Sequence, residues 1–168
     1  MSCRLKVALG AGTAVLLLLG VGAFFVLQPA KTSAYVSPHY SYTFDYPNQW
    51  HVTKSSSRAR VFASVKDDKS LPEAVVLDID CLPNSRKLSP QSFWAQEQQA
   101  PNRNPERGIG RTRLRSGIVA YESQGQGQTS YTVYTVTHAE VACEMVTYAA
   151  PPSAAAQVEK ILNSFRWK

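Results

Sequence analysis

The sequence has few residues suited to metal binding or nucleophilic catalysis. It contains three cysteines and three histidines in 168 residues, and none of the spacings H-x-H, H-E-x-x-H or C-x-x-C occurs. Metal sites of the common zinc classes are therefore not expected. The G-x-S-x-G motif of serine hydrolases is absent, and no glycine-rich loop joins a strand to a helix with the spacing that holds phosphate. We expect no enzyme, no bound metal and no cofactor.

The remaining titratable candidates have ordinary structural roles in the sequence pattern. His39, His51 and His138 fall in a tether, at a strand end and in a hairpin turn, where we expect surface histidines rather than catalytic bases. Asp78 and Asp80 share one face of a predicted strand, as paired carboxylates for acid–base work or for a cation would. Alternating acids are common on the solvent face of strands, and we expect that role here.

Charge is also missing from one long segment near the N-terminus. Residues 7–27 contain no charged residue, and as a helix they would extend about 31 Å, which matches the hydrocarbon core of a bilayer. We expect a retained transmembrane helix, with residues 1–6 in the cytoplasm because Arg4 and Lys6 precede the span. A secretory signal peptide cleaved after Ala34 is the alternative, although the apolar run is longer than a usual signal core.

The rest of the chain is long enough for one exported domain. We expect this domain at residues 40–168, connected to the span by a tether at residues 28–39 that carries two prolines and small residues. Three of the 18 basic residues lie at or before Lys31, which leaves 15 basic and 12 acidic residues and a net charge of +3. This charge is too small to indicate nucleic-acid binding.

Cysteine usage is compatible with export. Cys3 precedes the apolar run, so it is not the lipidated cysteine of a bacterial lipoprotein, which follows such a run. Cys81 and Cys143 remain as a pair that an oxidising compartment would allow to join. The sequence does not fix the distance between them, so a disulfide and two free thiols both stay open as alternatives.

Aromatic and β-branched residues alternate with polar ones along several segments. Tyr42, Phe44 and Tyr46 occupy every second position before Pro47, a pattern typical of a strand with one face on a core. Trp50 begins a second short strand and is expected to close one end of that core. Further strands are predicted at 60–66, 74–82, 112–121, 131–137 and 141–148, the last two as an antiparallel hairpin.

Two helices are predicted among these strands. The first begins at Ser89–Pro90 and ends near Gln99, with Phe93 and Trp94 against the sheet. The second follows Ser153 and has apolar residues at helical spacing. Strands dominate and do not alternate regularly with helices, so we expect an α+β fold with a central antiparallel sheet flanked by helices.

Arginines gather after the first helix, where segment 102–110 is predicted as a polar loop. Five arginines and one acid occur between positions 103 and 115, namely Arg103, Arg107, Arg111, Arg113 and Arg115. On a strand, the last three would share one face and form a basic ridge. The planar guanidinium suits carboxylate and phosphate groups, so an acidic partner or anionic lipid head groups are candidates for binding there. A solvated sheet face is the alternative.

Two short motifs carry a family resemblance. The opening Y-T-F-D-Y-P-N-Q-W at 42–50 is similar to the strand followed by Y-P-x-x-W of the PsbP-like fold family, and the closing I-L-N-S-F-R-W at 161–167 is similar to its last helix ending in S-F. With the order of elements, the resemblance covers about residues 40–168. This family includes the lumenal extrinsic subunit of photosystem II, a Ran-binding nuclear import factor, and exported bacterial proteins and lipoproteins.

The resemblance implies an α/β/α sandwich with a non-catalytic binding or assembly role. No metal or reaction-centre contact motif of the photosynthetic members carries over to this sequence, so a link to photosynthesis is not implied. We therefore expect a membrane-anchored module on the periplasmic or cell-surface side that binds a protein or an envelope component. The alternative is an exported accessory protein that captures a small ligand between sheet and helix.

Overall fold

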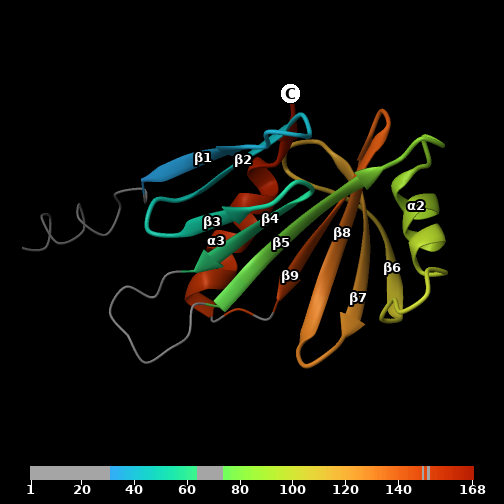
Figure 1. The fold of residues 1–168 in the computed structure, drawn as a ribbon. Helices are drawn as coiled ribbons and strands as arrows, with labels where there is room; N and C mark the ends of the chain where they lie inside the picture. Colours follow the sequence, from blue (N-terminus) through green and yellow to red (C-terminus); the bar gives the residue numbers. More distant parts are fainter. Residues whose placement is uncertain (1–30, 64–73, 149, 151) are drawn as a thin grey trace, which may run out of the picture. The chain divides into compact units, whose positions relative to one another are not determined.

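The computed structural model describes residues 31–63, 74–148, 150 and 152–168. The predicted span at 7–27 lies outside these residues, and within them no helix is long and apolar enough to cross a bilayer. The described elements (Figure 1) are β1 (Thr32–Val36), β2 (Tyr42–Pro47), β3 (His51–Lys54), β4 (Arg58–Ala63), β5 (Ala74–Pro83), α2 (Pro90–Glu97), β6 (Glu106–Arg113), β7 (Val119–Gln126), β8 (Ser130–His138), β9 (Val141–Tyr148), α3 (Pro152–Ser164) and β10 (Arg166–Trp167).

The strands form two antiparallel sheets. The large sheet has the order β3-β4-β5-β9-β8-β7-β6, and the small one has the order β1-β2-β10. Every neighbouring pair is antiparallel, and two helices accompany the strands in the described ranges. The expectation of a strand-rich, antiparallel α+β fold is therefore confirmed, as is the hairpin now seen as β8 and β9.

One face of the large sheet packs against α3 and carries the main hydrophobic core. The helix places Val158, Ile161 and Leu162 at helical spacing toward this core. Leu77 and Ile79 of β5 are fully buried in the same core. Each such side chain contributes about 1.5–3 kcal/mol through its removal from water, so this layer holds the helix to the sheet.

The aromatic strand of the sequence is the centre of the small sheet. Tyr42 and Phe44 of β2 are buried in the core, Trp50 is buried beside them, and Tyr46 packs against the same cluster with part of its surface exposed. The ring of Tyr42 lies 5.2 Å from that of Phe165 after α3. Aromatic contacts of this kind connect the small sheet to the C-terminal helix.

The domain begins earlier than the sequence indicated. Thr32–Val36, predicted as part of the tether at 28–39, form β1 and pair with β2 along five residues. The Oγ1 of Thr43 also donates to the carbonyl of Tyr35, whose ring stacks on Phe44 at 4.9 Å. The sequence of β1 starts with small residues and gives no clear strand pattern. The strand forms because its backbone groups pair with those of β2, which would otherwise lack partners along this edge. The compact unit therefore starts at Thr32 rather than at residue 40.

The predicted strand at 112–121 is two strands with a turn between them. The backbone N–H of Leu114 donates to the carbonyl of Ile118 at 2.9 Å, and that of Gly117 donates back to Leu114 at 2.9 Å. Gly117 has a φ of 88°, a left-handed conformation that glycine adopts without steric cost. The chain consequently reverses after β6 and returns as β7, which adds a strand to the sheet.

The opposite face of the large sheet is only partly covered. The Oγ of Ser89 caps α2 by accepting from the N–H of Ser92 at 3.3 Å, as the sequence predicted. This helix packs on β7 and β8, with Phe93 buried and the ring of Trp94 at 4.9 Å from that of Tyr121. In the described part of the chain, no helix covers the same face of β3, β4 and β5 (Figure 1). We call this uncovered region the open face.

A disulfide joins two central strands. Cys81 of β5 and Cys143 of β9 lie opposite each other in register, and their sulfur atoms are bonded. Both residues are fully buried in the core on the α3 side of the sheet. Of the two alternatives that the sequence left open, the structure contains the bonded pair.

Candidate functional site

The open face presents ion pairs between two neighbouring strands. Arg58 of β4 lies opposite Asp80 of β5, and Arg60 lies opposite Asp78. The Nε of Arg58 is 3.1 Å from Oδ1 of Asp78, and the Nε of Arg60 donates to its Oδ2 at 3.2 Å. Arg58 Nε is also 3.8 Å from Oδ2 of Asp80. Strand alternation places these side chains on the face away from the α3 core.

Asp78 is not the solvent-facing carboxylate that the sequence indicated. Its side chain is only 6% exposed, because two arginines of the neighbouring strand lie across it. Burial raises the pKa of Asp78 above its ordinary value of 3.8, and Arg58 and Arg60 reverse that effect only in part. An unpaired buried carboxylate is costly, so the two arginines make the burial of Asp78 tolerable.

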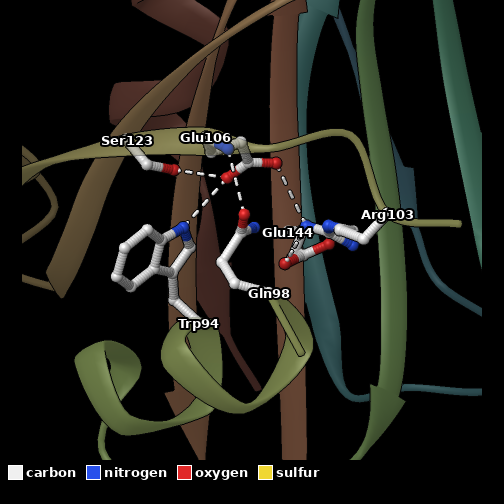
Figure 2. Close-up of polar contacts among 6 residues, drawn as sticks. All are labelled: Trp94, Gln98, Arg103, Glu106, Ser123 and Glu144. Carbon is white, nitrogen blue, oxygen red and sulfur yellow. Dashed lines mark hydrogen bonds and ion pairs between the residues drawn. The ribbon is translucent and has the colours of Figure 1, made fainter. Parts of the chain in front are cut away.

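A second charged group surrounds Arg103, in the loop that follows α2 (Figure 2). Its Nη2 donates to Oε1 of Glu144 on β9 at 2.7 Å and to Oε1 of Glu106 on β6 at 3.2 Å. The side chains of Glu144 and Glu106 are 8% and 3% exposed. One guanidinium therefore makes charge-assisted hydrogen bonds with two buried carboxylates.

Burial is the largest influence on the protonation of this group. It raises the pKa of Glu144 above its ordinary value of 4.5, and Arg103 opposes the rise without cancelling it. Burial alone would lower the pKa of Arg103, but Glu144 and then Glu106 raise it overall. Arg103 thus stays charged, whereas Glu144 holds a proton more firmly than an exposed glutamate does.

Glu106 has partners for both carboxylate oxygens. Its Oε2 accepts from Nε1 of Trp94 at 3.0 Å and from Oγ of Ser123 at 2.7 Å (Figure 2). Its backbone N–H donates to Oε1 of Gln98 at 3.0 Å. Because Arg103 occupies the other oxygen, Glu106 connects α2, β6 and β7 as a structural anchor rather than as a free acid or base.

Residues of both charged groups, though not Arg60, line one hollow of about 510 Å³, which we call the polar hollow. Its walls also include Tyr131 and Tyr148 and the turn between β7 and β8. Arg58 Nε and Asp78 Oδ1 lie buried in its lining 3.1 Å apart as an ion pair, and Oδ1 of Asp80 is buried there without a hydrogen bond in the described ranges. The hollow therefore combines ion pairs between strands with one buried carboxylate oxygen whose hydrogen bond is unmade.

The five arginines singled out in the sequence do not form one surface. Arg103 is hydrogen-bonded to Glu106 and Glu144. Arg115 lies beyond the end of β6, where its Nη2 is 3.5 Å from Oε1 of Glu159 on α3. Arg115 therefore lies outside the strand, and strand alternation does not place it in one ridge with Arg111 and Arg113.

A bulge in β6 divides the remaining arginines. The register with β7 shifts between Gly108 and Gly110, so β6 has one extra residue there. Beyond the bulge, side chains at odd-numbered positions therefore point to the opposite face of the sheet from those before it. Arg111 and Arg113 therefore lie on the α2 side of the sheet, and Arg107 lies on the other side. Strict alternation would have placed all three on one face, and the sequence alone does not locate the bulge.

Comparison with known proteins concerns the fold. No protein-family model and no curated protein sequence matches this chain. The solution structure of cyanobacterial PsbP (CyanoP) from Synechocystis sp. PCC 6803 is similar, with a TM-score of 0.53 and 14% identity over 84% of this chain and 95% of that chain. The crystal structure of the Ran-binding protein Mog1p from Saccharomyces cerevisiae is similar with a TM-score of 0.50 and 8% identity, over 83% of this chain and 96% of that chain.

This chain has the PsbP-like fold. The resemblance that the motifs at 42–50 and 161–167 indicated is thus confirmed for the fold. At such low identities the likeness concerns the arrangement of the backbone, and it assigns no functional residue to the PsbP-like domain.

Three charged residues that line the polar hollow were not singled out from the sequence of the PsbP-like domain: Arg58, Glu106 and Glu144. A signal for Glu144 exists, since it is a lone acid within the apolar strand V-A-C-E-M-V and needs a partner once buried. Glu106 lies in a segment predicted as a loop, where nothing local marks it. Arg58 stands just before a predicted strand, and only the pairing with β5 reveals its role.

Proposed function

We propose that this chain is a membrane-anchored, extracytoplasmic and non-catalytic module that binds a protein partner through the polar hollow. The observation that carries the proposal is the gathering of ion pairs, some of them partly exposed, around one hollow on an uncovered sheet face. Partly exposed charged side chains can make charge-assisted hydrogen bonds to a partner, so the hollow suits a surface that supplies matching donors and acceptors.

The charges of the hollow define the chemistry of such a partner. Asp80 is the most accessible of its aspartates, with 34% of the side chain exposed and its Oδ2 3.8 Å from Arg58 Nε. A lysine, arginine or amide of the partner would donate to the accessible part of this carboxylate. Arg58, with 43% of its side chain exposed, would donate to an acid or carbonyl beside it. We therefore expect a partner surface that carries both signs of charge.

The shared fold supports a binding role. Mog1p, which has a similar structure, is described as a Ran-binding protein. A fold hosts many functions, so this likeness adds to the argument from the hollow and does not replace it.

The acidic residues of the polar hollow are already held in hydrogen bonds and ion pairs, which supports a role without catalysis. Glu106 uses both oxygens in fixed contacts, and Glu144 is held by Arg103. A general acid or base needs an oxygen within reach of a substrate. Asp78 and Asp80 belong to the ion pairs with β4, which suits recognition of a partner.

Two observations support the proposed anchor and compartment. The disulfide between Cys81 and Cys143 is of a kind that persists in oxidising compartments. Cleavage after Ala34 would cut β1 between two residues that pair with β2, so a retained span at 7–27 preserves the strand. The basic residues before the span would keep the N-terminus in the cytoplasm and place the PsbP-like domain outside.

Site-specific photocrosslinking tests the binding face. Thr53 is exposed on the edge strand β3 opposite Arg60, and therefore points to the open face, whereas Lys54 points to the other side. A photocrosslinking residue at Thr53 of the full chain, in its own cells, should give one discrete adduct, and the same residue at Lys54 should not. Asp80→Asn should reduce the yield of the Thr53 adduct. Equal adducts from both positions, or none from Thr53, would reject the open face as the binding surface.

The proposed location has a separate test. Protease added to intact cells or spheroplasts should digest the PsbP-like domain and leave a membrane-embedded fragment that includes residues 7–27. Protection of the domain from external protease would reject the extracytoplasmic location without affecting the argument for the hollow.

A further inference from the structure

A second cavity lies at the start of α2, whereas the polar hollow adjoins the loop that follows this helix. Its volume is about 510 Å³, within the range of roughly 300–1,000 Å³ that is usual for small-molecule sites. The first residues of α2, strands β6, β7 and β8, and the C-terminal strand β10 contribute to its walls. The sequence suggested ligand capture between sheet and helix as an alternative function, and this cavity occupies such a place.

Most of the cavity wall is apolar or aromatic. Pro90 from α2, Ile118 just before β7, Val119 at its start, and the rings of Tyr121 and Trp167 line it. Hydroxyl and amide groups complete the lining. Such walls suit a ligand with an apolar body.

The aromatic walls are held in place by their own contacts. The ring of Trp167 stacks on His138 at 5.2 Å and meets Phe165 edge-on at 5.4 Å. Tyr121 is buried, and its ring lies 4.9 Å from that of Trp94. Since these contacts fix the rings without any ligand, the cavity is preformed and binding requires little ordering of its walls.

Among the residues that the structure describes, Arg111 is the only charged one that lines the cavity. Within the described ranges its guanidinium has no hydrogen bond and no ion pair. Two other arginines of the 103–115 segment do have hydrogen-bond partners. Arg113 donates to the carbonyl of Gly117 at 2.8 Å, and Arg103 donates to two glutamates. A guanidinium without a partner, beside a largely apolar cavity whose described lining contains no acid, favours a ligand with one negative charge.

We propose that this cavity binds a small amphipathic anion, with its apolar body between Tyr121 and Trp167 and its carboxylate or similar group on Arg111. The inference depends neither on the membrane anchor nor on a protein partner. It assigns a second binding site to the domain, apart from the polar hollow. A short-chain monocarboxylate has the required chemistry, and octanoate is a suitable soluble probe.

Calorimetric titration tests the proposal with the full chain in lipid nanodiscs, with empty nanodiscs as the blank. Octanoate, 1-octanol and octylammonium share one apolar body and differ in charge. We expect octanoate to bind at least about tenfold more tightly than 1-octanol, because a charge-assisted hydrogen bond to arginine is added. Octylammonium should bind more weakly than either. No binding of octanoate, or equal binding of all three probes, would overturn the proposal.

Two matched variants locate the binding. Arg111→Gln should weaken octanoate binding about tenfold, because it removes the charge that receives the carboxylate. Arg107→Gln is the control, since Arg107 is also exposed and unengaged in the described ranges but lies on the other face of β6. Val119→Trp, which fills the cavity, should abolish binding. Unchanged affinity in the Arg111 variant, or an equal loss in the Arg107 variant, would overturn the assignment.

Discussion

Arg103 is the residue on which the buried charges of the domain depend. Its replacement by glutamine leaves two glutamates with little access to water and without a counter-charge. We expect Arg103→Gln to lower the free energy of unfolding by about 3 kcal/mol, as is typical when one partner of a buried ion pair is removed. Urea unfolding followed by circular dichroism measures this loss.

Arg107→Gln provides the comparison for that experiment. Arg107 is exposed and has no side-chain partner in the described part of the chain. Its replacement should change the free energy of unfolding by less than about 0.5 kcal/mol. Similar losses in the two variants would mean that Arg103 contributes no more than a surface arginine.

Glu144 should make stability depend on pH in a defined direction. Burial raises its pKa in the folded state above the ordinary value of 4.5 that an unfolded chain retains. Between these two pKa values the folded state binds more protons, so the free energy of unfolding falls as pH rises through this window. The loss is complete above the pKa of the folded state.

The replacement Glu144→Gln removes this titration. The free energy of unfolding of the wild type minus that of this variant should decrease as pH rises from about 4.5, as measured by urea unfolding at several pH values. Glu159→Gln, at an exposed ion pair on α3, is the control variant. A pH-independent difference for Glu144→Gln would show that its carboxyl group titrates alike in the folded and unfolded states.

At the scale of elements, alternating apolar residues predicted strands well where one face meets the core. The strands around Phe44 and Leu77 were located because apolar residues that meet the core recur there at every second position of the sequence. The segment 123–128 was predicted as a flexible connection, yet most of it belongs to β7. Its glycines and glutamines give no apolar signal, because this part of the strand is held by backbone hydrogen bonds to β6 and β8 on either side.

The disulfide between β5 and β9 should contribute measurably to stability. It closes a loop with a sequence separation of 62 residues. A disulfide of this kind typically stabilises a domain by about 2–4 kcal/mol, chiefly by restricting the unfolded chain. We expect the wild type to unfold at a lower urea concentration once it has been unfolded, reduced and refolded under reducing conditions. The use of one sequence in both states avoids the cavity that Cys81→Ala would create, and coincident unfolding curves would contradict the expectation.

At the scale of the whole molecule, the candidate site could not be predicted because its residues meet only through the sheet. Arg103 and Glu144 are 41 positions apart, and their contact requires β9 to lie between β5 and β8. Arg60 and Asp78 meet through the register of β4 on β5. Charge and spacing identified some of these residues, but only the strand order brings them to one hollow.

The position of β1 makes the state of the N-terminus a testable property of the whole chain. Residues 32–34 pair with β2, and the Oγ of Ser33 donates to Oδ1 of Asn48 at 2.7 Å. A fragment of residues 35–168 should therefore unfold at lower urea concentrations than a fragment of residues 32–168, because three of the five residue pairs between β1 and β2 are lost. A chain that needs these pairs retains its N-terminus, so protein purified from its own membranes should have the mass of a chain that includes residues 1–34. A mature N-terminus at Tyr35, together with equal stability of the two fragments, would instead identify residues 1–34 as a removable signal.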